Sequence, residues 1–490
     1  MGIEIRGPVR VRFAPSPTGF LHLGGVRTAI YNDLLRQHAG GAFILRIEDT
    51  DKERSDEAMT RQIQSALAWI GVVWDEGPFL QSERLPRHRE RAEELLAAGK
   101  AYRCFCAPEE LDRQRAEAQA KGLAFRYPRT CLHRPQEEID ALLAAGAPFA
   151  VRFKMPDDHI RFTDIVRGAM DFPPEALDDF ILLRSDGTPT YHMSVVVDDI
   201  DMAVTHVIRG EDHLSNTPKH IPLFETLGGA VPAFAHLPLI LGPDKKRLSK
   251  RYGATSVEEF RNEGVLPPAL YNFMALLGWS PGEDREILSR EEMVALFDVN
   301  RLNASAAVFD REKMLWMNGQ YMLKSTLDDL RPHLQPFLEQ AGLADADPQR
   351  LEAALELHRT RARTLKELAE MVVPYFRETL VYDPAACAKL IKDPDLPSHL
   401  DELRRRYAGL PVFTKDALEA ELRSLSEARG IKAGVLIHPT RMALSAATAG
   451  PPLFDLIEIM GRDASLAHLD RFNAFLKAES AVIGPKLTQP

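Results

Sequence analysis

The chain has 490 residues, which is too long for one hydrophobic core and indicates about three to five domains. Its hydrophobic content of 45% is that of a globular protein, and 71 acidic against 61 basic residues give a net charge of −10, which by itself argues against a nucleic-acid partner. No apolar run reaches bilayer length, no secretory signal opens the chain, and only four cysteines occur. We therefore expect a soluble cytoplasmic protein without a disulfide scaffold.

The first predicted element is a strand that leads through a Pro/Gly-rich loop into a helix. Apolar residues alternate with arginines over residues 9–13, as in a half-exposed strand, and every fourth position is apolar over residues 26–34, as in a helix. The loop ends in His22, Gly24 and Gly25, where free N–H groups of the helix N-terminus favour a phosphate. The glycines leave room for a nucleotide, and His22 adds a donor. A simple turn with a surface histidine is the alternative.

A second strand follows this helix and completes a strand–helix–strand unit. Residues 42–47 form a largely apolar run after a Gly-Gly break, which is typical of a central parallel strand. This order implies a right-handed crossover and a doubly wound α/β sheet, whose ligands bind beyond the carboxyl ends of the strands. Glu48 lies at that end of the second strand.

Three of the four cysteines lie in two short motifs. Cys104 and Cys106 form a Cys-x-Cys pair, and Cys131 and His133 form a Cys-x-His pair after a further twenty-four residues. Three thiolates and one imidazole make a closed tetrahedral set of the kind that structural zinc takes. Three buried cysteines and an exposed histidine are the alternative.

Residues 151–172 alternate short strands and turns, which is consistent with an insertion that splits the nucleotide-binding fold. We expect a hairpin over residues 180–191 and a return of the main fold with a strand over residues 202–208. Residues 209–213, with the sequence Arg-Gly-Glu-Asp-His, then fall at the carboxyl end of that strand. This position favours a binding site over a solvated turn.

A basic cluster at residues 245–251 follows an apolar run that predicts a buried strand. It places five cations around one serine, so the acidic chain carries a local basic surface that suits RNA or phosphate. Beyond residue 251 the pattern becomes helical, and from residue 327 strand patterns nearly vanish. Prolines gather at residues 381–397, which predicts two helical bundles joined there.

Two segments resemble the HIGH and KMSKS signatures of class I aminoacyl-tRNA synthetases, namely His-Leu-Gly-Gly at 22–25 and Arg-Leu-Ser-Lys-Arg at 247–251. With Ser-Pro-Thr-Gly at 16–19 and Arg-Ile-Glu-Asp-Thr-Asp at 46–51, the set resembles glutamyl-tRNA synthetase. Gly25 stands where the first signature has histidine, and Arg247 where the second has lysine. Both departures keep the properties that phosphate binding needs, because Gly25 opens the loop further and Arg247 keeps the positive charge.

The resemblance implies an ATP-dependent glutamate–tRNA ligase. Such enzymes activate L-glutamate with ATP to glutamyl-adenylate, release diphosphate, and pass glutamate to the 3′-terminal adenosine of tRNA(Glu). The implied catalytic residues are His22 and Lys250. The implied ATP-binding residues are His22, Gly24, Gly25, Arg247, Ser249 and Lys250, and the implied glutamate-binding residues are Arg12, Ser16, Glu48, Tyr191 and Arg209.

The resemblance also implies partners outside the amino-acid site. Mg²⁺ is expected on the ATP phosphates, and one structural Zn²⁺ per chain on Cys104, Cys106, Cys131 and His133. Arg361 stands where the family keeps an arginine in enzymes that discriminate between tRNAs, so it is expected to read the anticodon. An ordinary solvated charge on an Arg-rich helix is the alternative for Arg361. A monomer without a membrane partner is expected.

The same resemblance assigns the domains. The fold class is α/β, with a split Rossmann-like catalytic domain, a zinc-bearing insertion and an all-helical C-terminal region. The expected boundaries are catalytic halves at 1–86 and 195–242, an acceptor-binding insertion at 87–194, a KMSKS and stem-contact domain at 243–326, and anticodon-binding subdomains at 327–385 and 386–490.

Other functions stay open at this point. A non-discriminating synthetase would also charge tRNA(Gln), and a glutaminyl-tRNA synthetase would share the catalytic motifs but is expected to carry a β-barrel anticodon region. A glutamyl-queuosine tRNA-modifying enzyme would lack the helical tail. A non-catalytic RNA-binding paralogue should have lost His22 or Lys250, and both are present.

Overall fold

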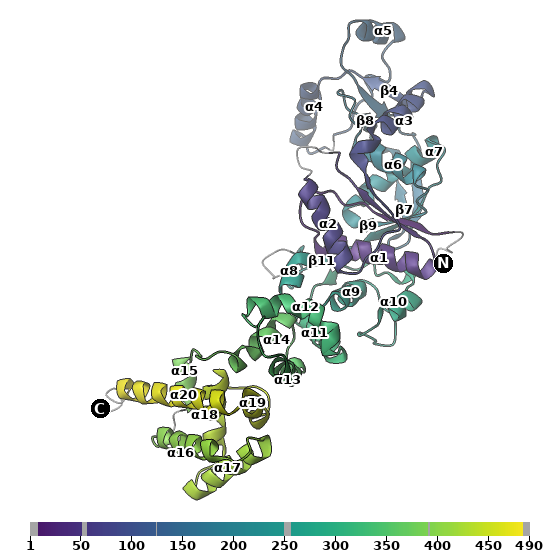
Figure 1. Cartoon of the computed structure of the whole chain (residues 1–490). Helices are drawn as coiled ribbons and strands as arrows, with labels where there is room; N and C mark the ends of the chain where they lie inside the picture. Colours follow the sequence, from purple (N-terminus) through teal and green to yellow (C-terminus); the bar gives the residue numbers. More distant parts are fainter. Residues whose placement is uncertain (1–7, 51–55, 124, 249–255, 391–392, 484–490) are drawn as a thin grey trace. The chain divides into compact units, whose positions relative to one another are not determined.

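A computed structural model describes residues 8–50, 56–123, 125–248, 256–390 and 393–483. The chain divides into two compact units, shown in Figure 1. The first consists of Met1–Phe260 and Pro267–Arg311, and the second of Arg261–Leu266 and Glu312–Pro490. Within the described residues, no helix is long and apolar enough to cross a membrane.

A seven-stranded sheet forms the centre of the first unit, in the order β3-β2-β1-β9-β10-β6-β7. Its strands are β1 (Arg10–Phe13), β2 (Ala42–Ile47), β3 (Glu76–Leu80), β6 (Ile160–Asp164), β7 (Gly168–Phe172), β9 (His206–Gly210) and β10 (Ala233–Leu237). Neighbours pair in parallel except β6 and β7, which are antiparallel. The predicted Rossmann-like sheet is confirmed, and its parallel strands end at one edge.

Within its described residues, this part of the chain also contains ten α-helices and a two-stranded sheet. The helices are α1 (Leu23–Ala39), α2 (Glu57–Trp69), α3 (Leu85–Ala97), α4 (Pro108–Ala120), α5 (Gln136–Ala144), α6 (Tyr191–Asp201), α7 (Thr217–Thr226), α8 (Val257–Asn262), α9 (Pro267–Leu276) and α10 (Arg290–Leu296). The small sheet pairs β11 (Ile240–Leu241) with β12 (Ala307–Val308). Helix α1 ends at Gly40, whose φ of 66° is the left-handed conformation that glycine adopts without strain.

The segment predicted as an insertion, residues 87–194, divides between two sheets. Strands β4 (Ala101–Cys104), β5 (Ala150–Phe153) and β8 (Ile181–Leu183) form a separate antiparallel sheet. Strands β6 and β7 of the same segment instead extend the seven-stranded sheet, because β6 pairs in parallel with β10. The pattern of short strands indicated a hairpin but carried no information about a partner strand about seventy residues away.

The second half of the main fold begins later than the sequence predicted. The strand expected over residues 202–208 starts only at His206, because α6 continues to Asp201 and Ala203 turns the chain with a φ of 51°. The expected hairpin is also shorter, since Leu183 bridges Pro189 and α6 already begins at Tyr191. Tyr191 therefore lies in the first turn of a helix rather than in a strand.

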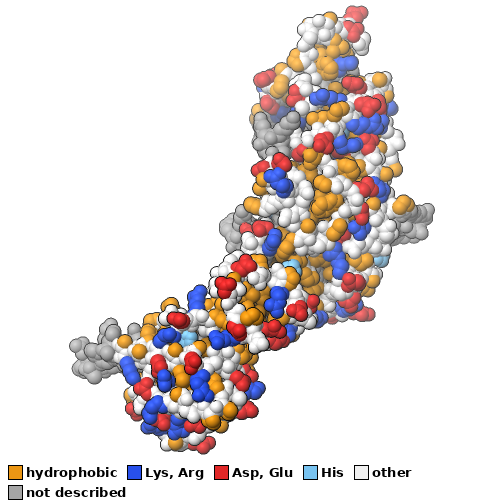
Figure 2. All heavy atoms as spheres, viewed as in Figure 1, with side chains coloured by type: hydrophobic (Ala, Val, Ile, Leu, Met, Phe, Trp, Pro, Cys, Tyr) orange, Lys and Arg blue, Asp and Glu red, His pale blue; other side chains and the backbone are white. Residues whose placement is uncertain are grey.

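The second unit is helical throughout its described residues, as predicted. Its helices are α11 (Arg311–Lys324), α12 (Leu327–Gln340), α13 (Pro348–Arg359), α14 (Leu365–Val372), α15 (Pro384–Leu390), α16 (Leu396–Gly409), α17 (Lys415–Arg429), α18 (Gly434–Ser445), α19 (Leu453–Met460) and α20 (Arg462–Ile483). Short α15 lies in the proline-rich segment that was expected to join two bundles. On the visible face in Figure 2, acidic and basic side chains are interspersed rather than separated by sign.

Candidate active site

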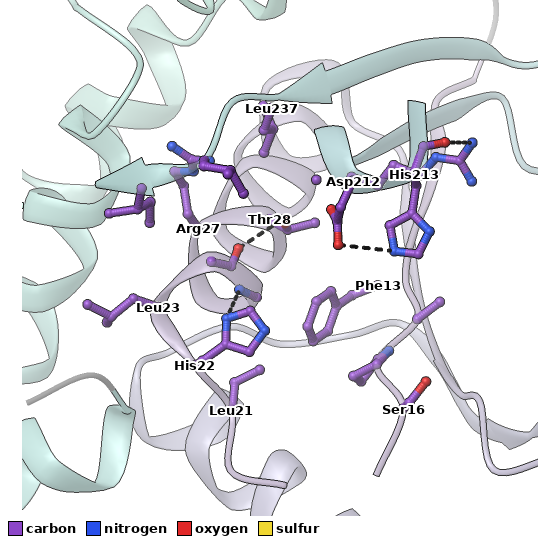
Figure 3. A pocket seen from close by; sticks show the side chains of 18 of the residues that line it. Phe13, Ser16, Leu21, His22, Leu23, Arg27, Thr28, Asp212, His213 and Leu237 are labelled. Atoms are coloured by element: carbon purple, nitrogen blue, oxygen red, sulfur yellow. Dashed lines mark hydrogen bonds and ion pairs between the residues drawn. The ribbon is translucent and has the colours of Figure 1, made fainter. Parts of the chain in front are cut away.

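A cavity of 870 Å³ lies at the carboxyl ends of β1, β2, β9 and β10 (Figure 3). Nine residues predicted to bind ATP or glutamate line it: Arg12, Ser16, His22, Gly24, Gly25, Glu48, Tyr191, Arg209 and Arg247. The predicted residues Ser249 and Lys250 lie outside the described residues. The structure therefore brings together residues that are up to 235 positions apart, from Arg12 to Arg247.

His22 caps the N-terminus of α1 with its imidazole. The backbone N–H of Gly25 donates to His22 Nδ1 at 3.3 Å, so we assign the ring proton to Nε2. Partial burial, and then the positive charge of Arg247, lower the pKa of His22. A neutral His22 with one N–H donor therefore stands at the helix end where an anion is favoured.

The two glycines after His22 make room for neighbouring side chains. A Cβ on Gly24 would lie 3.1 Å from the His22 imidazole, and one on Gly25 would lie 3.0 Å from Leu21 Cδ1. Neither glycine has a positive φ, so crowding rather than backbone strain explains them. From the sequence, the only reason proposed for these glycines was that they leave room for a nucleotide.

Arg209, at the end of β9, is a buried cation that donates only to neutral groups. Its Nε donates to His236 Nε2 at 3.1 Å and its Nη2 to Thr217 Oγ1 at 2.8 Å. Its Nη1 donates to the Tyr191 hydroxyl at 3.3 Å. The residue is 6% exposed and lines the cavity, and no described carboxylate accepts a hydrogen bond from it. A buried guanidinium with neutral partners is suited to hold an anion.

Arg12, by contrast, belongs to a charge-balanced network. Its Nε donates to Asp199 Oδ1 at 3.4 Å, and fully buried Arg46 donates to the same oxygen at 2.6 Å. Arg46 also donates to Glu48 at 3.4 Å. Burial raises the pKa of Glu48, while the charges of Arg46 and Arg12 oppose that rise. The pKa of Glu48 is raised overall, and its ionised form, beside these two arginines, suits a cationic group.

Neutral aromatic side chains surround the Arg209 end of the cavity. The Tyr191 hydroxyl lies 3.1 Å from His213 Nδ1, and His192 Nδ1 lies 3.0 Å from His220 Nε2. Burial, followed by the charge of Arg209, lowers the pKa of His213 to about 4. These histidines are neutral at pH 7, so Arg209 carries the positive charge of this cluster.

Three residues behind Arg209 escaped the sequence analysis: Asp164, Thr217 and His236. His236 Nδ1 lies 2.6 Å from Asp164 Oδ2, and all three residues are at most 1% exposed. The only signal was a histidine inside the apolar run over residues 233–241. Such a histidine is equally compatible with a core position, so the sequence did not distinguish the two.

Cys104, Cys106 and Cys131 form a cluster whose sulfurs lie within 4.8 Å of one another. His133, the predicted fourth ligand, is exposed and does not belong to this group. Instead the Tyr127 hydroxyl lies 3.4 Å from Cys104 Sγ and 3.5 Å from Cys106 Sγ. The geometry therefore brings together the three cysteines but replaces the histidine by a buried tyrosine.

Positive charge borders the cysteine cluster. The Arg152 guanidinium lies 4.0 Å from the centre of the Tyr127 ring and interacts with Cys104. A hydrogen bond from Cys104 lowers the pKa of Cys131 to about 6. The bond with Cys131, followed by burial, raises the pKa of Cys104 to about 12, so the thiolate is favoured at Cys131 and not at Cys104. Three sulfurs with a fourth donor match the coordination number of structural zinc.

Arg361 lies in the second unit, two residues beyond α13. It is exposed, and its backbone N–H donates to His358 O at 2.9 Å. Partial burial, and then the charge of Arg361, lower the pKa of Arg441 on α18. Arg361, in the turn after α13, and Arg441, on α18, therefore lie close enough to repel each other on the helical unit.

Comparison with known protein families assigns both parts of the chain. Residues 8–316 match the family described as tRNA synthetases class I (E and Q), catalytic domain, and residues 327–473 match the anticodon binding domain family. The second match begins at Leu327, which is also the first residue of α12.

The relatives described next match nearly the whole chain, and each is named a glutamate–tRNA ligase. The chain is 46% identical over 475 residues to glutamate–tRNA ligase 2 of Koribacter versatilis, with 96% of this chain and 99% of the relative covered. It is 44% identical over 470 residues to glutamate–tRNA ligase of Geobacter sulfurreducens, with the same coverage. A crystal structure of a glutamate tRNA ligase from Elizabethkingia meningosepticum in complex with its amino acid superimposes with a TM-score of 0.87, at 36% identity, covering 96% of this chain and 99% of that chain.

The predicted resemblance is thus confirmed along nearly the whole chain, in sequence as well as in fold. The chain belongs to the glutamate–tRNA ligases, which are ATP-dependent class I tRNA synthetases.

Proposed function

We propose that this chain activates L-glutamate with ATP to glutamyl-adenylate, releases diphosphate, and transfers glutamate to the 3′-terminal adenosine of tRNA(Glu). Arg209 carries the proposal, because it is a buried cation at the cavity whose hydrogen-bond partners are all neutral. Family membership supplies the reaction, and Arg209 explains the choice of an acidic amino acid.

Glutamate binding is proposed to use both of its ends. Arg209 Nη1 carries two N–H groups and donates one to Tyr191, so a side-chain carboxylate can accept the other. Glu48 is suited to the α-ammonium group, and Ser16 and Arg12 complete the set at the same cavity. Glutamine would present a donor amide to arginines, which can only donate, and aspartate would be too short to bridge the two ends of the site.

ATP is proposed to bind at the N-terminus of α1. His22 offers its Nε2–H group, and Arg247 lines the same cavity. Lys250 is proposed as the second catalytic donor from its place in the sequence motif, with Ser249 beside it. Both donors would stabilise charge that develops on the phosphates in the transition state, and Mg²⁺, which prefers oxygen ligands, would neutralise part of that charge.

Zinc is proposed to bind the cysteine cluster as a structural ion. Cys104, Cys106 and Cys131 supply three ligands, and Tyr127 stands closer to the sulfurs than the predicted His133. A closed site of this kind offers no position to a substrate and stabilises its own subdomain. We further propose that the protein works as a cytoplasmic monomer, in line with the reaction of its family.

Aminoacylation with purified tRNAs tests the proposal. The protein should charge tRNA(Glu) with labelled glutamate in the presence of ATP and Mg²⁺, and should not charge tRNA(Gln) with glutamine. Charging with glutamine in place of glutamate would overturn the proposal. The helical second unit supports the glutamate reading, because a glutaminyl enzyme is expected to carry a β-barrel anticodon region.

A second candidate is a non-discriminating enzyme that also places glutamate on tRNA(Gln). The two anticodons differ in their third base, which is cytosine in tRNA(Glu) and guanine in tRNA(Gln). Arg361 can only donate, and cytosine presents two acceptors on its Watson–Crick edge where guanine presents two donors and one acceptor. Exposed Arg361, with Arg441 nearby, therefore favours discrimination.

Substitution of Arg361 separates these two candidates. Arg361→Gln should raise charging of tRNA(Gln) relative to tRNA(Glu), because a mismatch at this base costs about 1–3 kcal/mol through unpaired donors. Exposed Arg331 on α12 offers a matched control, since Arg331→Gln removes the same charge from the helical unit. Equal glutamylation of both tRNAs by the wild type would support the non-discriminating enzyme. An unchanged ratio in Arg361→Gln would show that Arg361 does not read the anticodon.

A further inference from the structure

A chain of three buried side chains runs from β6 through β10 to β9 and ends at the cavity. Asp164 Oδ2 lies 2.6 Å from His236 Nδ1, and His236 Nε2 lies 3.1 Å from Arg209 Nε. Asp164 and His236 are 1% and 0% exposed, so water does not interrupt the chain. Asp164 and His236 stand behind Arg209 rather than in the cavity lining, which contains Arg209 alone of the three.

The hydrogen bonds fix the protonation of the histidine. Arginine can only donate, so His236 Nε2 must accept the bond from Arg209 and cannot carry a proton. The proton therefore lies on Nδ1 and is donated to Asp164. Thr217 agrees with this assignment, because its hydroxyl accepts from Arg209 Nη2 at 2.8 Å and can donate to His236 Nε2 at 3.1 Å.

Asp164 is itself held as an acceptor. Its Oδ1 accepts hydrogen bonds from the backbone N–H groups of Val166 at 3.0 Å, Arg167 at 2.9 Å and His236 at 3.3 Å. Burial raises the pKa of Asp164, but the bonds from His236 and the backbone outweigh it and lower the pKa overall. An ionised Asp164 in turn keeps the proton of His236 on Nδ1.

We propose that Asp164 and His236 are positioning residues that orient Arg209 for the side-chain carboxylate of the amino-acid substrate. This inference rests on the proposed function, in which Arg209 binds glutamate. Asp164 supplies counter-charge through the imidazole, so the negative group does not touch the guanidinium. The Nη1 N–H group that does not donate to Tyr191 then remains available at the cavity instead of being occupied by a protein carboxylate.

Arg12 shows the effect of a direct ion pair between an arginine and a protein carboxylate. Its Nε donates to the Asp199 carboxylate, which also binds Arg46. A substrate carboxylate at Arg12 must share that cation with a protein anion. At Arg209 the protein anion is Asp164, which is separated from the guanidinium by the imidazole of His236. The charge of Arg209 is therefore compensated while its guanidinium stays available to a substrate carboxylate. The chain thereby gives the two arginines of the cavity different roles.

Asp164→Asn tests the positioning role directly. Asn can keep Oδ1 on the three backbone N–H groups, and its amide then donates to His236 Nδ1. The imidazole proton moves to Nε2, where it faces the Arg209 Nε–H group. Two opposed buried donors should raise KM for glutamate by about tenfold or more, measured by aminoacylation, with KM for ATP unchanged.

Repeating Asp164→Asn in a His236→Gln protein distinguishes a positioning role of Asp164 from a general contribution to the stability of the fold. In His236→Gln, the amide oxygen can accept the hydrogen bond from Arg209. The amide has no ring proton that a change at residue 164 could move. Asp164→Asn should then add little further increase in KM for glutamate over His236→Gln alone. A merely structural Asp164 would give the same increase in both backgrounds, and this result would overturn the inference.

Asp33 provides a matched control for loss of a buried carboxylate. It is 1% exposed on α1 and accepts a hydrogen bond from Tyr271 at 3.0 Å. Asp33→Asn should lower the melting temperature without changing KM for glutamate. Unchanged KM for glutamate in Asp164→Asn, in a wild type that charges glutamate, would overturn the positioning role alone. Failure of the wild type to charge glutamate would overturn the proposed function and this inference with it.

Discussion

The cavity and the cysteine cluster both bury ionisable side chains in the first unit, but they present opposite chemistry. At the cavity, Arg209 is a cation whose partners are neutral oxygens and nitrogens. At the cluster, three sulfurs crowd within 4.8 Å of one another around the Tyr127 hydroxyl. A buried charge without a partner of opposite sign is costly. Where the protein does not supply that partner, a ligand of the opposite charge is expected. The Arg209 end of the cavity is therefore suited to an anion, and the cluster to a cation.

The two regions also differ in how far they depend on distant parts of the chain. The cluster is formed by Cys104, Cys106, Tyr127 and Cys131, which span fewer than thirty residues. The Arg209 end of the cavity needs β6, β9 and β10 in one sheet. Changes at the cavity should therefore alter catalysis, and changes at the cluster should alter a local subdomain and its use of tRNA.

Arg209→Gln should give the largest effect. Removal of a buried cation that pairs with a carboxylate costs about 2–5 kcal/mol, so kcat/KM for glutamate should fall roughly 100-fold or more. Steady-state aminoacylation at varied glutamate measures this, and elemental analysis of the same variant should show full zinc content. The cavity would lose its assigned role if kcat/KM for glutamate stayed near that of the wild type.

His22→Ala should reduce adenylate formation by about 100-fold while changing the affinity for glutamate little, because its donor acts on charge that grows in the transition state. Pyrophosphate exchange in the presence of tRNA measures the rate, and Lys250→Ala should behave in the same way. His22→Ser is the control, since serine can still cap α1 but lacks the ring donor. Recovery of the rate in His22→Ser would show that the cap, and not the donor, matters.

Cys131→Ser should remove zinc and damage charging at low tRNA concentration more than it weakens ATP binding. Elemental analysis and KM values for tRNA and ATP measure the two effects. Tyr127→Phe against His133→Ala then identifies the fourth ligand, and we expect zinc to be lost more readily from Tyr127→Phe. Absence of zinc from the wild type, with three freely titratable thiols in the native protein, would contradict the zinc site.

Gly24→Ala should give the smallest effect. Its Cβ would lie 3.1 Å from the His22 imidazole, and overpacking of about 1 kcal/mol should shift that ring and lower kcat about fivefold. Gly19→Ala is the matched control in the same loop, because no heavy atom lies within 4 Å of its Cβ position. Equal rates in the two variants would show that the absence of a side chain at residue 24 does not position His22.

The sequence predicted the parts of the site that depend on short stretches of chain. The strand, loop and helix around His22 follow from local periodicity and from glycines beside the histidine. Arg12, Glu48 and Arg209 could be placed together, because parallel strands end at one edge of a sheet whatever their exact order. The three cysteines, in two motifs on either side of α4, likewise come together within one short segment of the chain.

The tertiary structure decided which long-range partners these residues meet. Nothing in residues 160–172 shows that β6 joins β10, and only that pairing places Asp164 beside His236. That Tyr127 rather than His133 lies beside the sulfurs depends on how the chain folds back between Cys106 and Cys131, which spacing does not specify. A sequence pattern records the period and chemistry of one segment, whereas hydrogen bonds between buried side chains depend on strand order and register, which are set by packing of the whole sheet.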